Sequence, residues 1–337
     1  YKVTPNFDAL ASEGIRFTQF YAAGQRSIEG VQTTLTGIPA LKGLPRLDVG
    51  IGISNFTRIG TIAQNNGYET LFTQSSNRDS FKISGITAAA GFNQFYGKED
   101  TPLIGNYPNH EEATFGWDYD SLMFFKSKLD SLKQPFLAYT FTGTTHEPYA
   151  DPGEKFHVRP HDAQGEAGFL NTMKYADWSL GQFIAAAKKE PWFDNTIFIF
   201  TADHANNLQK GGFLKRFHTP LLIYAPKIFN SREDKTISSQ LDIMPTIIDL
   251  LGFDTEYTSV GESVFNKKSP YAFTTMGGTA ITLINDKAYL KHSLKNRLEA
   301  EIYNPEKGKV DFDEMEAFLL SLDQLSFELL RDNQWSR

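Results

Sequence analysis

The feature that most constrains the fold is an apolar run, rich in β-branched and aromatic residues, that ends in an acid and an imidazole. It reads TIFIFTADH and spans residues 196–204. Such a run is typical of a strand buried on both faces, as in a parallel sheet covered by helices. Ligands of these sheets bind beyond the carboxyl ends of the strands, so we expect Asp203 and His204 at the functional edge.

The pair formed by Asp203 and His204 suits a divalent metal. Carboxylate oxygen and imidazole nitrogen are both ligands of Zn²⁺ and Mn²⁺. The residue types alone leave a second interpretation open, in which Asp203 caps a following helix and His204 is an ordinary surface residue.

Composition excludes several classes of protein. The chain has 337 residues, 40% hydrophobic with 28 Phe, which is enough for one large α/β core. A net charge of -7 without a basic tract argues against nucleic acid as a partner. The absence of cysteine excludes disulfides, zinc–thiolate sites and a cysteine nucleophile. No stretch reaches the roughly 18 apolar residues of a membrane span, so any signal or anchor is expected upstream of residue 1.

Helical and strand-like patterns alternate along most of the chain. Helices are expected over residues 4–14, from residue 27, and over residues 57–67, 119–132, 168–190, 239–252 and 311–330. Buried or alternating strands are expected over residues 15–21, 68–73, 134–141, 196–200 and 221–226. Shorter strand-like pieces follow at residues 271–275, 280–284 and 287–291.

This order of elements predicts an α/β fold. We expect a mostly parallel central sheet flanked by helices, then a small antiparallel sheet and a final helix. Residues 1–256 are expected to form the catalytic core. Residues 257–337 are expected to be an appendage on the same domain, because no linker separates the two parts.

Ser27 stands where the second expected helix begins, and two interpretations fit it. Serine is common at a helix N-cap, so its role can be structural. A hydroxyl at this place also faces free N–H groups and the positive end of the helix dipole, where a phosphate binds well. The neighbouring Arg26 could pair with that charge.

Other polar residues lie near strand ends. Arg78 follows one strand, where its guanidinium could bind a phosphoryl or sulfuryl oxygen bidentately, and His146 follows another. Either residue could equally be a solvated loop residue. His218 precedes its strand, so the sheet-edge argument does not place it. His157 and His161 are expected to be solvated in a polar loop, with a lid over the site as the alternative.

Six short motifs, in this order, resemble the alkaline phosphatase and sulfatase superfamily, and within it the lipoteichoic acid synthase and phosphoglycerol transferase branch. The resemblance runs from Thr4 to about Phe265. The motifs are GQRSIEG at 24–30, NRD at 77–79, TTHEPY at 144–149, TADH at 201–204, FHTPLLIYAP at 217–226 and QLDIMPT at 240–246.

The resemblance implies a divalent-metal phosphotransferase. Ser27 matches the position of the nucleophile, where the family more often has threonine, and it matches a metal ligand together with Asp203 and His204. Mn²⁺ is the implied ion, with Zn²⁺ or Mg²⁺ as alternatives. The family's first metal ligand is an acidic residue that ends a strand before Thr4, so that strand is expected upstream of residue 1.

The same resemblance implies which residues bind the substrate. Arg78 and His146 match residues that hold the phosphoryl group. His218 resembles a histidine that related transferases place near the substrate or a second metal. Ser76 stands where lipoteichoic acid synthases have an aromatic residue, so the resemblance does not identify the lipid headgroup that is transferred.

The implied reaction moves a phosphoglycerol or phosphoethanolamine headgroup from a phospholipid to a glycan or polyol acceptor through a serine-linked intermediate. It would take place outside the cytoplasm, at a membrane reached through a segment outside this chain. Two other functions stay open: a sulfatase-like hydrolase, and a non-catalytic relative that binds an anionic headgroup or a glycan. Sulfatases carry the nucleophile in a Cys/Ser-x-Pro-x-Arg motif, which SIEGV at residues 27–31 does not match.

Overall fold

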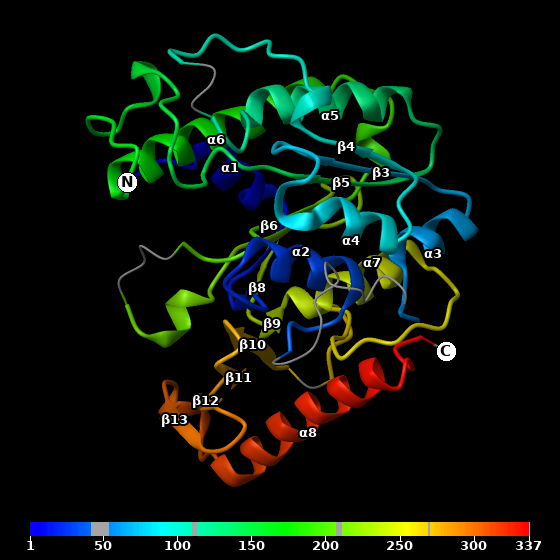
Figure 1. Cartoon of the computed structure of the whole chain (residues 1–337), viewed down its shortest axis with the longest axis vertical. Coiled ribbons are helices and arrows are strands. Elements are labelled where there is room, and N and C mark those ends of the chain that lie inside the picture. Colours follow the sequence, from blue (N-terminus) through cyan, green and yellow to red (C-terminus); the bar gives the residue numbers. More distant parts are fainter. Residues whose placement is uncertain (42–53, 110–112, 207–210, 269, 337) are drawn as a thin grey trace.

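The computed structural model describes residues 1–41, 54–109, 113–206, 211–268 and 270–336. Two sets of strands form its centre (Figure 1). In the first set β3 (Glu69–Gln74) lies between β4 (Gln94–Tyr96) and β5 (Phe136–Phe141), and all three are parallel.

The second set is mixed and has the order β6, β7, β1, β8. These strands are β6 (Phe198–Thr201), β7 (Leu221–Tyr224), β1 (Ile15–Phe17) and β8 (Arg232–Asp234). β7 runs antiparallel to both of its neighbours, whereas β8 is parallel to β1. The strand expected over residues 15–21 is divided, because its second part, β2 (Phe20–Tyr21), pairs instead with β9 (Ser238–Ser239).

Helices cover both faces of the strands, as the sequence predicts. One face carries α1 (Pro5–Glu13), α5 (Asp118–Ser131) and α6 (Glu166–Ala187). The other carries α2 (Ser27–Thr36), α3 (Ile59–Asn65), α4 (Ile83–Ala89) and α7 (Ile243–Leu251). Short 3₁₀ helices are η3 (Ser80–Lys82), η4 (Lys98–Asp100), η6 (Glu154–Phe156), η7 (Phe193–Asn195), η8 (Phe213–Arg216), η9 (Gln240–Asp242) and η10 (Pro305–Lys307).

Two neighbouring residues of β3 show how the layers are held together. Leu71 belongs to the apolar cluster that includes α1, α5 and α6, while Phe72 belongs to the cluster on the opposite face, which includes α2, α3, α4 and α7. Both are completely buried, and each such side chain contributes about 1.5–3 kcal/mol through removal of apolar surface from water. This two-sided burial explains why the strand reads as a nearly continuous apolar run.

The C-terminal part is an antiparallel meander covered by one long helix. Its strands are β10 (Ala272–Met276), β11 (Ala280–Ile284), β12 (Ala288–His292) and β13 (Arg297–Ile302), and α8 (Phe312–Arg331) packs on them. The first three strands and the helix confirm the prediction. β13 was not predicted. All of its residues are exposed, and its charged side chains hide the apolar pattern by which a strand is usually recognised in a sequence.

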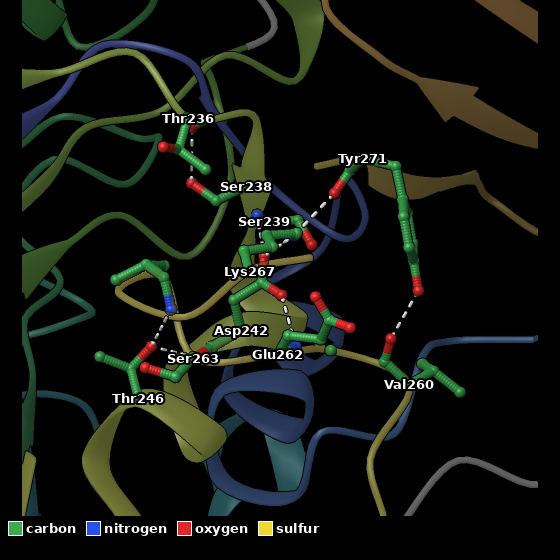
Figure 2. Close-up of polar contacts among 12 residues, drawn as sticks. Thr236, Ser238, Ser239, Asp242, Thr246, Val260, Glu262, Ser263, Lys267 and Tyr271 are labelled. Carbon is green, nitrogen blue, oxygen red and sulfur yellow. Dashed lines mark hydrogen bonds and ion pairs between the residues drawn. The ribbon is translucent and has the colours of Figure 1, made fainter. Parts of the chain in front are cut away.

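A buried ion pair ties the segment after α7 to the start of that helix (Figure 2). Lys267 Nζ lies 2.6 Å from Asp242 Oδ2, and both side chains are almost completely buried. The same carboxylate accepts hydrogen bonds from the backbone N–H groups of Ser239 and Glu262. Lys267 Nζ also donates to the Tyr271 carbonyl oxygen, which leads directly into β10.

The strands β5 and β6 depart from their predicted burial. Both sequences predict strands buried on both faces, yet every residue of β5 and β6 is only half-buried. Within the described ranges β5 pairs with β3 alone and β6 with β7 alone, so each has one edge with no strand beside it. In the part of the chain that is described, no helix is both long enough and apolar enough to span a membrane.

Candidate active site

Asp203 and His204 lie just beyond the carboxyl end of β6, both half-buried. His204 Nδ1 contacts the Ala205 carbonyl oxygen at 3.0 Å. Because a carbonyl can only accept, Nδ1 carries the hydrogen and Nε2 keeps its lone pair. That Nε2 lies 3.4 Å from Asp203 Oδ2. Ligand atoms about 2.0–2.2 Å from a tetrahedral ion lie about 3.3 Å apart, so the two donor atoms fit a shared metal.

The antiparallel direction of β7 brings His218 to the same edge. Thr201, the last residue of β6, pairs with Leu221, the first residue of β7. A residue before β7 therefore lies where β6 ends, which the sequence alone did not show. His218 is exposed, and its Nε2 donates to the Thr18 carbonyl oxygen at 2.9 Å, which leaves Nδ1 with a lone pair.

Ser27 is the first residue of α2, and Arg26 occupies the N-cap position. No side chain caps this helix among the described residues, so the capping interpretation of Ser27 is wrong. The Ser27 side chain is 6% exposed, and within the described ranges its hydroxyl has no hydrogen-bond partner. Arg26 is exposed and likewise forms no ion pair with a described residue. A free hydroxyl and a free cation thus flank the helix N-terminus.

Two contacts hold α2 against the Asp203 segment. Gly30 lies so close that a Cβ atom there would overlap the Asp203 carbonyl oxygen, so only glycine fits at this crossing. Gln240, completely buried, connects the Asp203 segment to the residues that lead into α2. Its Nε2 donates to the carbonyl oxygens of Ala202 (2.8 Å) and Asp203 (2.7 Å), and its Oε1 accepts from the Ala23 N–H at 2.8 Å.

Gln240 and Gly30 were not predicted as site residues. Both fall within motifs that carry the family resemblance, GQRSIEG and QLDIMPT. A buried amide and a glycine carry no chemistry of their own, so only the contacts identify them as positioning residues.

Arg78 and His146 follow β3 and β5, which are parallel and therefore end at one edge. Aromatic contacts join their loops, because the His146 ring lies 5.7 Å from Phe81 and 3.9 Å from Phe115 between ring centroids. His146 is exposed, with Nδ1 2.6 Å from the Glu147 carbonyl oxygen. The Arg78 guanidinium is engaged by Asp100 Oδ1 at 2.6 Å.

Tyr139 of β5 contacts α2. Its hydroxyl lies 3.3 Å from Thr34 Oγ1. Burial raises the pKa of Tyr139 to about 12, and the charge of Asp203 acts in the same direction. The tyrosine therefore stays neutral at ordinary pH. It places a hydroxyl within the electrostatic reach of Asp203.

Gly30 packs α2, which begins at Ser27, against the Asp203 segment, and β7 puts His218 at the edge where β6 ends. Arg78 and His146 follow the neighbouring strands β3 and β5. A hollow of about 450 Å³ lies elsewhere on the molecule. It is lined by Asp8, Ala11, Ser12, Arg16, Ser231 and Arg232. We place the candidate site at the strand ends, because that hollow contains no pair of facing metal donors.

Comparison with known proteins identifies the family of the chain. The family model described as Sulfatase matches residues 1–253. The chain belongs to the sulfatase family. Phosphoglycerol transferase I of Shigella flexneri is 24% identical over 280 residues, which cover 79% of this chain and 36% of that protein. The chain thus spans about a third of the length of the curated relatives it matches.

Solved structures show the same fold. An alkaline phosphatase superfamily protein from Vibrio parahaemolyticus has a TM-score of 0.84 and 25% identity, over 100% of this chain and 83% of that one. The lipoteichoic acid synthase LtaP from Listeria monocytogenes has a TM-score of 0.78 and 18% identity, over 98% of this chain and 86% of that one. These likenesses confirm the predicted alkaline phosphatase-like α/β fold.

Proposed function

We propose that this sulfatase-family chain carries the catalytic core of a phosphotransferase. It would move a phosphoglycerol-type headgroup, with phosphoethanolamine as the alternative, from a phospholipid to a glycan or polyol acceptor outside the cytoplasm, at a membrane. The observation that carries the proposal is the unpaired Ser27 hydroxyl at the start of a helix that Gly30 packs against Asp203. Similarity to phosphoglycerol transferase I favours this headgroup.

Ser27, Asp203 and His204 would hold a divalent ion, Mn²⁺ first and Zn²⁺ or Mg²⁺ as alternatives. When bound, such an ion lowers the pKa of a coordinated hydroxyl and offsets charge on a phosphoryl oxygen. The facing lone pairs of Asp203 and His204 support this assignment, because the second ring nitrogen of His204 is already committed to a backbone carbonyl.

The proposed reaction has two balanced steps. Ser27 Oγ bonds to the headgroup phosphorus while the bond from phosphorus to the diacylglycerol oxygen breaks. The proton that the serine loses is matched by the proton that diacylglycerol gains. An acceptor hydroxyl then bonds to phosphorus, releases its proton, and Ser27 leaves and becomes protonated again. The free N–H groups at the start of α2 stabilise the phosphoryl charge in both steps.

The remaining predicted residues would hold the substrate. Arg78 would bind a phosphoryl oxygen through the guanidinium N–H groups that Asp100 and the Phe95 carbonyl oxygen leave available. His146 Nδ1 already donates to the Glu147 carbonyl oxygen, so its Nε2 would accept a hydrogen bond from a headgroup hydroxyl. His218, at the edge where β6 ends, would contact the headgroup or a second metal.

Turnover of defined substrates by Ser27 variants tests the proposal. Ser27→Ala should lose transferase activity, while its free energy of unfolding changes by less than about 0.5 kcal/mol because the side chain caps nothing. Ser27→Thr keeps a hydroxyl and should retain activity. The assay compares a glycerophospholipid with an aryl sulfate, each with Mn²⁺.

The outcomes separate the alternatives. Preference for the aryl sulfate would favour the sulfatase-like hydrolase. Binding of the phospholipid without turnover, by a wild-type protein that also includes the strand expected upstream of residue 1, would favour the non-catalytic relative. An active Ser27→Ala protein would contradict the proposed nucleophile.

A further inference from the structure

A second group of side chains of metal-ligating types lies in the loop between β5 and α6. One ligand atom each from Asp151, His157 and His161 lies within 4.8 Å of the others. The two histidines were expected to be solvated, but both are half-buried, as is Asp151. Their rings stack with centroids 5.7 Å apart.

The loop that carries these residues is held by a buried side chain of α6. Asn171 is completely buried, and its Oδ1 accepts from the Val158 N–H at 2.7 Å. Its Nδ2 donates to the Arg159 carbonyl oxygen at 3.1 Å and approaches His161 Nδ1 at 3.4 Å. The stretch between the two histidines is therefore fixed by the protein rather than by solvent.

The other arm of the loop is fixed by hydrogen bonds as well. Asp151 Oδ1 accepts from the Gly153 N–H at 2.8 Å and lies 2.7 Å from His157 Nε2. His161 Nε2 donates to the Tyr149 carbonyl oxygen at 3.0 Å. His161 Nδ1 therefore carries the lone pair, which the Asn171 amide approaches at 3.4 Å, and a metal ion bound there would displace this long contact.

Nearby cations do not neutralise this cluster. Lys155 Nζ lies over the rings of Phe156 and Trp178, at 4.7 and 4.6 Å from their centroids. Arg159 pairs with Glu166 at 3.1 Å. Asp151 therefore faces only the two histidines and backbone N–H groups among the described contacts.

We propose that Asp151, His157 and His161 form a zinc site distinct from the one at Asp203 and His204. Two imidazoles and one carboxylate are a frequent ligand set for Zn²⁺ with a fourth position open to water. The ion would replace the hydrogen bond between His157 and Asp151 and join the two arms of the loop. Tyr149, at one end of this loop, hydrogen-bonds through its side chain to Asn206, three residues beyond Asp203. Zinc would therefore fix a loop that borders the candidate active site.

Zinc titration of the full chain, in competition with a chromophoric chelator, tests the site. In an Asp203→Ala background, which disables the other donor pair, we expect one zinc equivalent to remain bound. Adding His161→Ala should weaken that binding at least about 100-fold, a larger loss than removal of an outer partner causes. Limited proteolysis should show that zinc protects residues 149–163 in the background protein but not after His161→Ala.

Two further variants keep the test decisive. Asp151→Asn preserves an oxygen acceptor for Gly153 and should fold, yet it should also lose zinc. Glu154→Gln removes an exposed carboxylate of the same loop and should leave zinc binding unchanged. The inference is overturned if the Asp203→Ala protein binds no zinc, or if its zinc survives both Asp151→Asn and His161→Ala. Neither result would bear on Ser27, because no step of the proposed transfer uses Asp151, His157 or His161.

Discussion

Gln240 shows at the scale of one residue how the candidate site is positioned. Its amide is the only described side chain that bonds both the Ala23 segment and the Asp203 segment. Gln240→Leu removes the hydrogen-bond partners of the Ala23 N–H and the Asp203 carbonyl oxygen and one of the two donors to the Ala202 carbonyl oxygen. Each buried group left unpaired costs about 1–3 kcal/mol. We expect urea unfolding to show a loss of at least about 2 kcal/mol, and Mn²⁺ affinity to fall about 10- to 100-fold.

An exposed glutamine provides the control for this prediction. Gln324 lies on the surface of α8 and bonds only to Glu328, four residues along the helix. Gln324→Leu should change the free energy of unfolding by about 0.5 kcal/mol or less and leave metal affinity unaltered. Equal behaviour of the two variants would remove Gln240 from the site.

Residue-level prediction succeeded where the signal was local. Asp203 and His204 were placed at a strand end because the apolar run itself marks that end. Ser27 was correctly placed at a helix start. The sequence could not show that its hydroxyl does not cap the helix, because the N-cap position falls one residue earlier, at Arg26. The burial of His157 depends on α6, and no pattern within the loop reveals Asn171 as its support.

At the scale of elements, the packing of α2 against the end of β6 decides whether a hydroxyl and metal donors can meet. Gly30→Ala puts a Cβ atom into the Asp203 carbonyl oxygen, so the helix or the Asp203 segment must move. Although alanine favours a helix by about 1 kcal/mol, the overlap should produce a net loss of about 1–3 kcal/mol. Activity and metal affinity should fall as well, measured by the same titration and phospholipid assay.

Gly85 of α4 is the matched helical glycine. No described heavy atom lies within 4 Å of a Cβ built there. Gly85→Ala should stabilise the protein by about 0.4–1 kcal/mol and leave activity unchanged. A Gly30→Ala protein that behaves like Gly85→Ala would mean that α2 does not need its close approach to Asp203.

Element positions followed from apolar periodicity, but strand directions and edges did not. The run at residues 221–226 predicts β7 without saying that it is antiparallel to β6, which is what brings His218 to the site edge. Likewise, the sequences of β5 and β6 predict full burial, whereas each has an edge without a neighbouring strand among the described residues.

At the scale of the whole molecule, we propose that the C-terminal meander and helix unfold together with the core. The buried pair of Asp242 and Lys267 joins them (Figure 2). Lys267→Met leaves a buried carboxylate without its cation, which typically costs about 3–5 kcal/mol. Thermal and urea unfolding should show one transition at a lower midpoint.

The surface pair of Arg16 and Glu233 is the control, with side chains 52% and 42% exposed. Arg16→Met should cost less than about 1 kcal/mol, because water screens that pair. A separate early transition in Lys267→Met, with the core transition unmoved, would show that residues 257–337 form an independent unit. From the sequence, only the lack of a linker indicated that residues 257–337 belong to the same domain. The ion pair could not be predicted, because its two residues lie 25 positions apart.

The central claim is that Ser27 carries the headgroup during transfer. The most direct measurement is mass spectrometry of the protein after brief exposure to phosphatidylglycerol and Mn²⁺. Trypsin cleaves after Arg26, so Ser27 begins a peptide ending at Lys42, and fragmentation can separate it from Thr33, Thr34 and Thr36. We expect a phosphoglycerol adduct on Ser27 that is absent from Ser27→Ala. Turnover with no adduct on Ser27, or with an adduct on another residue, would contradict the account.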